Sequence, residues 1–203
     1  MTRWATLTIA LLFSVIATVQ YSGTATGQAA GDGWTVLFDG KNLDQWDSDG
    51  SATFKIEDGA VIATDKKDPK ATASYLISKK SYKNFVVRAE FWVSDDANSG
   101  LFLRCDPKKI GAKTCYEYNI FDKRPDQTYG TASIVYIGEV NPMPKAGGKW
   151  STMEAGANGR HLTIVFDGKK TVDVQNGLWD EGHIALQFGV GTVKFRKIEI
   201  KAL

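Results

Sequence analysis

The stretch "NFVVRAEFWVS", residues 84–94, has the pattern that decides the fold. Apolar side chains occupy every second position, at Phe85, Val87, Ala89, Phe91 and Val93. Charged residues such as Arg88 and Glu90 stand between them. Strict alternation is typical of a β-strand with one buried face, because successive side chains point to opposite sides. We therefore expect a long strand here that contributes one face to a hydrophobic core.

Similar short runs continue along the chain and include "TFKI", "AVIAT", "SYLIS", "RHLTIVF", "TVDVQN" and "TVKFRKIEIKAL". Asp58-Gly59, Asn158-Gly159 and Asp167-Gly168 are turn signals between such runs. No internal repeat or long helical period interrupts the pattern. About a dozen strands without helices predict an all-β fold with two antiparallel sheets. We expect a jelly-roll sandwich in preference to a barrel.

The first residues of the chain differ from the rest. Arg3 precedes the apolar run "WATLTIALLFSVIATV", and the small, polar stretch "QYSGTATGQAAGDG" follows. This order is typical of a secretory signal peptide. A retained anchor helix is the alternative, but the run is shorter than the roughly 20 residues that a membrane span prefers. We expect a signal peptide and short leader over 1–30, one domain over 31–203, and a periplasmic or secreted protein.

The charge balance limits the classes of partner. The formal net charge is +2, and cleavage of the leader would remove Arg3. Basic residues occur in short pairs such as Lys108-Lys109 and form no dense block. Nucleic acid is therefore an unfavourable partner, and we expect no stable membrane insertion after cleavage.

Both cysteines lie in "SGLFLRCDPKKIGAKTCYEYNIFD", residues 99–122, where two alternating runs flank a connection with Pro107 and Gly111. Two cysteines this close in an exported protein indicate a disulfide between Cys105 and Cys115. The bond would hold the two strands of a hairpin in register.

The register of this hairpin decides which polar residues meet. With the cysteines directly opposed, Arg104 shares a sheet face with Tyr118 and Asp122, while Glu117 and Asn119 lie on the other face. A bulge beside the disulfide would instead bring Arg104 to Glu117. The sequence leaves both registers open. It also leaves open whether Arg104 and Glu117 form a structural ion pair or a catalytic cleft.

Other candidate ligands are sparse. His161 and His183 do not have metal-ligand spacing and are expected to be structural or exposed. Asp44, Asp47 and Asp49 lack the Gly and terminal Glu of an EF-hand loop. No nucleophile-elbow, zinc-protease or phosphate-loop motif occurs. We expect no metal ligand set and no cofactor, although a divalent cation remains compatible with the sequence.

Several stretches together resemble the family of 3-keto-disaccharide hydrolase domains over residues 33–203. They include "GWTVLFDGKNLDQW", "FKIEDGAVIAT", "NFVVRAEFWVSDDANSGLFLRC", "YEYNIFD", "GRHLTIVFDGK" and "EGHIALQFGVGTVKFRKIEI". The order and spacing are specific as a set. The resemblance implies a concanavalin-A-like lectin/glucanase sandwich, which agrees with the strand pattern.

The resemblance also implies a site. Glu117 and Asp122 match the paired acids of the family, and Arg104 matches the arginine that follows its "NSG" strand. These three residues are the expected catalytic groups. The expected substrate-binding residues are Asn98, Tyr118, Tyr136, Gln187 and Arg196. The family tends to have a histidine before the glycine that follows Gln187, where this chain has Phe188.

The family's substrate class implies a mechanism. A ketone at C3 of a sugar acidifies the hydrogen at C2, so a base can form an enolate that expels the C1 oxygen. Glu117 or Asp122 would be the base, Arg104 would stabilise the oxyanion, and Tyr136 or the other acid would donate a proton. Two alternatives are a non-catalytic carbohydrate-binding module and a direct glycosidase that uses both carboxylates.

The leader gives a prediction that can be checked directly. We expect the mature chain to begin between about Ser22 and Asp32, because small residues cluster there as signal cleavage requires. N-terminal sequencing of secreted material measures this, and a start at Met1 or Thr2 would refute it.

Overall fold

The computed structural model describes Met1, residues 29–64 and residues 73–203. The signal peptide and leader expected over 1–30 therefore lie almost wholly outside the described residues. The elements are β1 (Ala29–Ala30), η1 (Gly31–Gly33), β2 (Trp34–Phe38), β3 (Trp46–Asp49), β4 (Thr53–Glu57), β5 (Ala60–Thr64), β6 (Ser74–Tyr82), β7 (Phe85–Val93), β8 (Ser99–Cys105), β9 (Tyr116–Ile120), η2 (Gln127–Tyr129), β10 (Trp150–Asn158), β11 (His161–Phe166), β12 (Lys169–Gln175), β13 (Gly182–Phe188) and β14 (Val193–Ala202).

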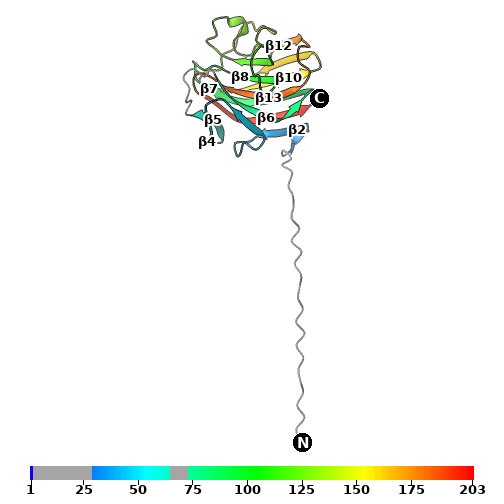
Figure 1. The fold of residues 1–203 in the computed structure, drawn as a ribbon. Helices are drawn as coiled ribbons and strands as arrows, with labels where there is room; N and C mark the ends of the chain where they lie inside the picture. Colours follow the sequence, from blue (N-terminus) through cyan, green and yellow to red (C-terminus); the bar gives the residue numbers. More distant parts are fainter. Residues whose placement is uncertain (2–28, 65–72) are drawn as a thin grey trace.

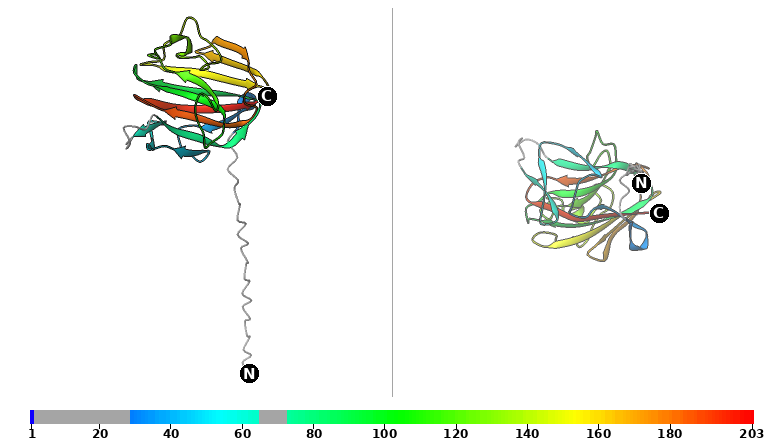
Figure 2. Two further views of the ribbon diagram at one scale, coloured as in Figure 1. Left: turned by 45° about the horizontal axis from the view of Figure 1, so that its top comes forward. Right: turned by 90° about the horizontal axis from the view of Figure 1, so that it is seen from below.

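The described strands form two sheets that stack face to face (Figure 1). The larger, nine-stranded sheet has the order β1-β2-β14-β7-β10-β11-β12, with β5 on β14 and β4 on β5. The five-stranded sheet has the order β3-β6-β13-β8-β9. Figure 2 shows the same layers from two further directions. The predicted antiparallel two-sheet sandwich is confirmed.

The core lies between the sheets. The alternating apolar residues of β7, from Phe85 to Val93, are each at most 2% exposed. They join one hydrophobic cluster with inward side chains of the five-stranded sheet, such as Leu101 and Leu186. The prediction that residues 84–94 form a long strand with one face in the core is therefore confirmed, because one face of β7 is removed from water.

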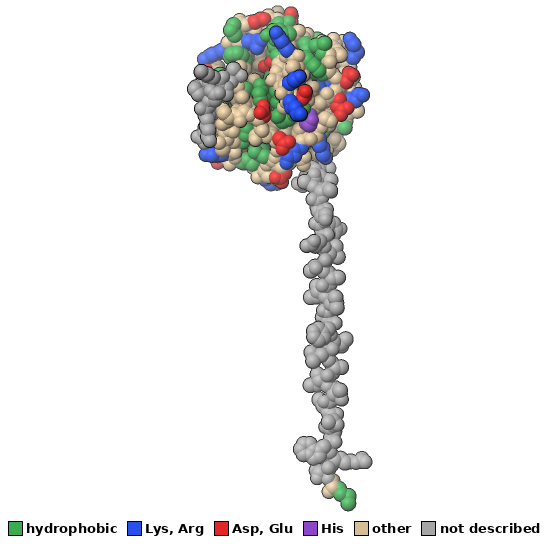
Figure 3. All heavy atoms as spheres, viewed as in Figure 1, with side chains coloured by type: hydrophobic (Ala, Val, Ile, Leu, Met, Phe, Trp, Pro, Cys, Tyr) green, Lys and Arg blue, Asp and Glu red, His purple; other side chains and the backbone are tan. Residues whose placement is uncertain are grey.

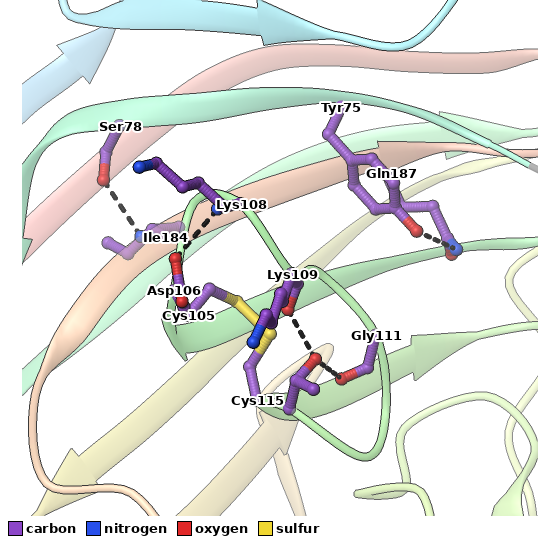
Figure 4. Close-up of a disulfide and its surroundings, with 11 residues drawn as sticks. Tyr75, Ser78, Cys105, Asp106, Lys108, Lys109, Gly111, Cys115, Ile184 and Gln187 are labelled. Atoms are coloured by element: carbon purple, nitrogen blue, oxygen red, sulfur yellow. Dashed lines mark hydrogen bonds between the residues drawn. A yellow bond between two sulfur atoms is a disulfide. The ribbon is translucent and has the colours of Figure 1, made fainter.

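The hairpin of β8 and β9 carries the predicted disulfide. Cys105 and Cys115 are bonded, with their Cα atoms 4.8 Å apart (Figure 4). Leu103 pairs with Tyr116, so Arg104 is an extra residue between that pair and the disulfide. The pairing of β13 with β8 is shifted at the same place.

The bulge turns the side chain of Arg104 inward. Arg104 has a φ of 59°, in the left-handed region that non-glycine residues rarely adopt. This backbone sends Arg104 to the same side as Leu103, toward the turn at Gly159 of the other sheet. Glu117 lies on the opposite face, paired with Phe102. The bulged register therefore occurs, but it does not bring Arg104 to Glu117.

The sheet edges are protected in different ways. Beyond β9, residues 132–135 follow the strand, and the backbone nitrogen of Val135 donates to the carbonyl of Glu117 over 3.0 Å. On the larger sheet, the edge strand β12 presents exposed Lys169, Lys170 and Asp173. The last two form an ion pair of 2.6 Å.

The surface of the domain has mixed charge. In the view of Figure 3, acidic and basic side chains are interspersed over the described surface, with apolar side chains between them. Among the described residues, no helix is both long and apolar enough to cross a bilayer.

The disulfide should contribute measurably to stability. We expect the double change Cys105→Ser and Cys115→Ser to lower the free energy of unfolding by about 2–3 kcal/mol, because the unfolded chain loses a constraint. Urea denaturation of the variant and of oxidised wild type measures the difference, and wild type treated with reductant is the matched comparison. Mass analysis that found two free thiols in the native protein would contradict the expectation.

Candidate functional site

The outward face of the five-stranded sheet gathers the polar residues that are available for chemistry. Cross-strand pairing places its side chains in two rows. We call this surface the site face, and its rows are Ile77–Ala185–Phe102–Glu117 and Tyr75–Gln187–Gly100–Asn119. The first row has three apolar side chains and ends at Glu117. The second row has three polar side chains, with Gly100 between Gln187 and Asn119.

Glu117 is the titratable group of the first row. It is 9% exposed and follows three apolar side chains that are almost fully buried. This burial raises the pKa of Glu117 to about 7, and the positive charge of Arg124 opposes the rise. A carboxyl group with a pKa near the working pH is suited to take up and return a proton.

Arg124 comes from the long segment between β9 and β10. Its Nε is buried and has no hydrogen-bond partner among the described residues. Its guanidinium lies 5.9 Å from the ring centre of Tyr136, and that ring is 5.8 Å from the ring of Tyr129. Tyr136 is 59% exposed and has a φ of 64°. A cation and an exposed aromatic ring therefore stand on the Glu117 side of the sheet.

Gln187 and Tyr75 lie side by side on β13 and β6 (Figure 4). The amide nitrogen of Gln187 donates to the hydroxyl of Tyr75 over 3.4 Å, and its Oε1 is buried without a partner. Burial raises the pKa of Tyr75, so its hydroxyl stays protonated at neutral pH. Gln187, expected to bind substrate, is thus part of the site face.

Asn119 ends the polar row on β9. Its Nδ2 donates to the carbonyl of Tyr129 over 2.6 Å, and its Oδ1 is buried without a partner. The sequence placed Asn119 on the face of Glu117 but assigned it no role. Arg124 was missed altogether, and its place in the long polar segment after β9 was the only signal for it.

Arg104, expected to be catalytic, lies inside the sandwich and not on the site face. It is 1% exposed, and its guanidinium donates to the carbonyls of Lys83, Gly159 and Trp179 over 2.6–3.0 Å. These bonds satisfy the buried cation. Tyr118 faces the same way, donates to the carbonyl of Gly156 over 2.7 Å and is fully buried. Burial raises its pKa far above the usual value.

Asp122 is occupied by the chain around it. Its carboxylate accepts hydrogen bonds from the hydroxyl of Thr131 over 2.6 Å and from the backbone nitrogens of Ala146 and Gly147, each 3.0 Å from Oδ2. This arrangement holds residues 145–147 against the end of β9. It leaves Asp122 less suited than Glu117 to act as a base.

The remaining expected residues are spread out. Asn98 lies two residues before Gly100 and is partly exposed. Arg196 lies on β14 of the larger sheet, where it pairs with Glu90 over 2.7 Å and covers the ring of Trp150 at 4.1 Å. The structure therefore places Gln187 on the same sheet face as Glu117 but Arg196 in the other sheet.

Both histidines have protein partners. Nδ1 of His183 lies 2.6 Å from the carbonyl of Ser78, and Nε2 of His161 lies 2.6 Å from Asp173. Within residues 29–64 and 73–203, no group of three or more His, Cys, Asp or Glu side chains could hold a metal ion.

The fold and the site face define a carbohydrate-related β-sandwich. Residues 33–201 match the model of the 3-keto-alpha-glucoside-1,2-lyase-like domain, and the chain belongs to that family. No curated protein sequence matches the chain.

Solved structures agree on the fold. A candidate glycosyl hydrolase from Parabacteroides distasonis ATCC 8503 superposes with a TM-score of 0.76 at 17% identity, over 88% of this chain and 99% of that one. The carbohydrate-binding module CBM66 from Bacillus subtilis gives 0.59 at 19% identity, over 84% and 96%. A Bacillus subtilis protein with a galectin-like fold gives 0.60 at 10% identity, over 79% and 90%. The expected lectin-type sandwich is confirmed.

The environment of Glu117 predicts a pH-dependent stability. Its pKa is about 7 in the folded state against an ordinary 4.5, so the folded protein favours the protonated carboxyl. The resulting stabilisation is complete below pH 4.5 and is lost as the pH rises through about 7. The exchange Glu117→Gln should therefore raise the free energy of unfolding at pH 8 by up to about 3 kcal/mol relative to its effect at pH 4.

Urea denaturation of wild type and variant at pH 4, 6 and 8 measures this difference. Glu57→Gln, at an exposed position of β4, is the matched control and should follow the wild-type pH dependence. A constant difference between Glu117→Gln and wild type across this range would show that the burial of Glu117 does not perturb its protonation.

Proposed function

We propose that the site face cleaves 3-keto-glycosides by removing the C2 proton and releasing the C1 oxygen. The observation that carries the proposal is Glu117, a buried carboxyl with a pKa of about 7 beside the charge of Arg124. Membership of the 3-keto-alpha-glucoside-1,2-lyase-like family supports the same substrate class. The C3 ketone makes the C2 hydrogen acidic, so the reaction needs a base and no strong acid. An ordinary glycoside lacks this ketone.

Glu117 is the base in this mechanism. Its carboxylate takes the proton from C2, and the electron pair of the C2–H bond moves into an enolate with the C3 ketone. Collapse of the enolate forms the C1=C2 double bond and breaks the bond from C1 to the leaving oxygen. The products are an unsaturated 3-keto sugar and an alcohol, and addition of water to the double bond would complete a hydrolysis.

Arg124 takes the role first expected of Arg104. A guanidinium hydrogen that lacks a protein partner can bind the oxygen on which the enolate charge develops. The guanidinium of Arg104 is buried between the sheets and bonded to three carbonyls there, so it does not reach the site face. We assign Arg124 to the oxyanion and Arg104 to the fold.

The leaving oxygen needs a proton. Protonated Glu117 can return the proton that it took from C2, because a pKa of about 7 suits both directions of transfer. The exposed hydroxyl of Tyr136 is a second donor on the Arg124 side of the site. Asp122 serves to hold residues 145–147 in place.

A non-catalytic carbohydrate-binding module is the second candidate. Phe188 stands where the family tends to have a histidine, and its ring packs in the core, 4.9 Å from Phe54 and 5.4 Å from Phe195. The structural similarity to CBM66 is in keeping with this candidate. A module of this kind would bind the sugar on the site face and release no product.

We infer that the protein works outside the cytoplasm. A disulfide between strands of the site-bearing hairpin is typical of oxidising compartments. The N-terminal sequence pattern supports export to the periplasm or the medium.

Cleavage of a matched pair of substrates tests the function. We expect methyl 3-keto-glucoside to be cleaved and methyl glucoside to be left intact, since only the ketone acidifies C2. Glu117→Gln should lower kcat/KM by about 100-fold or more, the usual contribution of a general base. In wild type, kcat/KM should rise with pH and level off above about 7.

Arg124→Gln should lower kcat more than it raises KM, whereas Arg160→Gln, on the exposed turn after β10, should match wild type.

Cleavage of both methyl 3-keto-glucoside and methyl glucoside would indicate a direct glycosidase. Binding of the keto sugar without cleavage would indicate the module.

A further inference from the structure

Two amide side chains on the site face have acceptor oxygens that no described donor satisfies. Gln187 on β13 and Asn119 on β9 both pair with Gly100 of β8, one on each side. Gln187 is 7% exposed and Asn119 is fully buried. We call Gln187, Gly100 and Asn119 the amide row.

The carbonyl beside Asn119 fixes which atom of that amide is left over. Nδ2 of Asn119 faces the carbonyl of Tyr129 at 2.6 Å, and a carbonyl can only accept, so the nitrogen must be on that side. Oδ1 is therefore the free atom. Nε2 of Gln187 donates to the hydroxyl of Tyr75, and Oε1 of Gln187 is buried without a donor among the described residues.

One of these oxygens lies close to the glycine. A Cβ added at Gly100 would lie 3.7 Å from Oε1 of Gln187, so this oxygen leans over the glycine toward the middle of the row. The same Cβ would lie 3.0 Å from the carbonyl of Tyr118, tighter than an ordinary contact. A side chain at this position would therefore crowd both the backbone of β9 and the amide of Gln187.

A buried acceptor without a donor is destabilising, and nearly all such atoms in folded proteins have a partner. Two unpaired amide oxygens in one row, on either side of a glycine, point to a ligand that supplies hydrogen-bond donors. The atoms accept hydrogen bonds and cannot donate them, so a ketone or enolate oxygen does not fit there. Hydroxyl groups do.

We propose that the amide row binds the C4 and C6 hydroxyl groups of the keto sugar. The proposal rests on the function proposed above. In a 3-keto-hexoside, C1 carries the leaving group, C2 loses its proton and C3 is the ketone, so the donors away from the reaction are at C4 and C6. Asn119 lies two residues from Glu117 on the same face of β9, about 7 Å along the strand.

The site face is therefore polarised. Acceptors in the amide row hold the unreactive end of the sugar, and the guanidinium of Arg124 holds the oxygen at C3. Glu117 ends the neighbouring apolar row and faces C2. A sugar without the C4 or C6 hydroxyl would leave an amide oxygen unpaired, so the row determines specificity.

Binding to a protein that cannot turn over tests the amide row. Glu117→Gln protein is titrated calorimetrically with methyl 3-keto-glucoside and with its 4-deoxy and 6-deoxy analogues. We expect both analogues to bind about tenfold more weakly or worse, as for a lost hydrogen bond in a buried site. Adding Gln187→Met gives a side chain of similar size without the acceptor. The analogue that lacks the hydroxyl bound by Gln187 should then bind nearly as well as the parent sugar, whereas the other analogue should still bind more weakly because Asn119 is unchanged.

Two further variants in the same Glu117→Gln background complete the test. Gln187→Glu keeps an acceptor oxygen and should keep the preference for the parent sugar. Glu57→Gln, on exposed β4, should change nothing. Thermal unfolding of each protein confirms that it is folded before it is titrated.

Equal binding of the parent and both analogues overturns the amide row. It is also overturned if Gln187→Met keeps the full preference for the parent over both analogues, or if the parent sugar does not bind at millimolar concentration. The proposed function fails separately, if wild type does not cleave the parent sugar. Binding that depends on the hydroxyl groups without cleavage by wild type would leave the amide row standing on a non-catalytic protein.

Discussion

The guanidinium of Arg104 holds one end of the sandwich together. It donates to the carbonyls of Lys83 and Trp179, in two connections that pass between the sheets, and of Gly159, in a turn of the larger sheet. A buried cation is costly unless its hydrogen bonds are made, so these turns must meet around it for the chain to fold. The bulge that points Arg104 inward leaves Phe102 and Glu117 facing outward. The site face therefore depends on a residue that lies outside it.

The fold was predictable because its signal is repeated. Residues 84–94 alternate over a full strand, and similar runs recur between turn signals throughout the described domain. The relation of Arg104 to Glu117 was not predictable, because it depends on a one-residue bulge and on the backbone conformation of Arg104, which have no local signature. A left-handed φ at an arginine is set by its distant carbonyl partners and not by its neighbours in sequence.

The site could be predicted only where strand alternation reaches it. Glu117 and Asn119 were expected on one face and lie there together. Arg124 enters from a long loop, and loop contacts follow from tertiary packing rather than from periodicity. Asp122 shows the limit of matching positions to a family pattern. The match identifies a carboxylate but not the backbone nitrogens of Ala146 and Gly147 that engage it.

The edge strand β12 bears on how the protein behaves in a crowded compartment. An open strand edge offers unpaired backbone groups to any other extended chain, and this is a common route to aggregation. On β12, Lys169, Lys170 and Asp173 are exposed along that edge, so an incoming strand would have to bury charge to pair with it. The main strand order ends on the other side at the two-residue β1, too short to be a template, and the five-residue β4 forms a further edge beside β5. The exposed charge on β12 therefore disfavours edge-to-edge pairing at the longest of these edges.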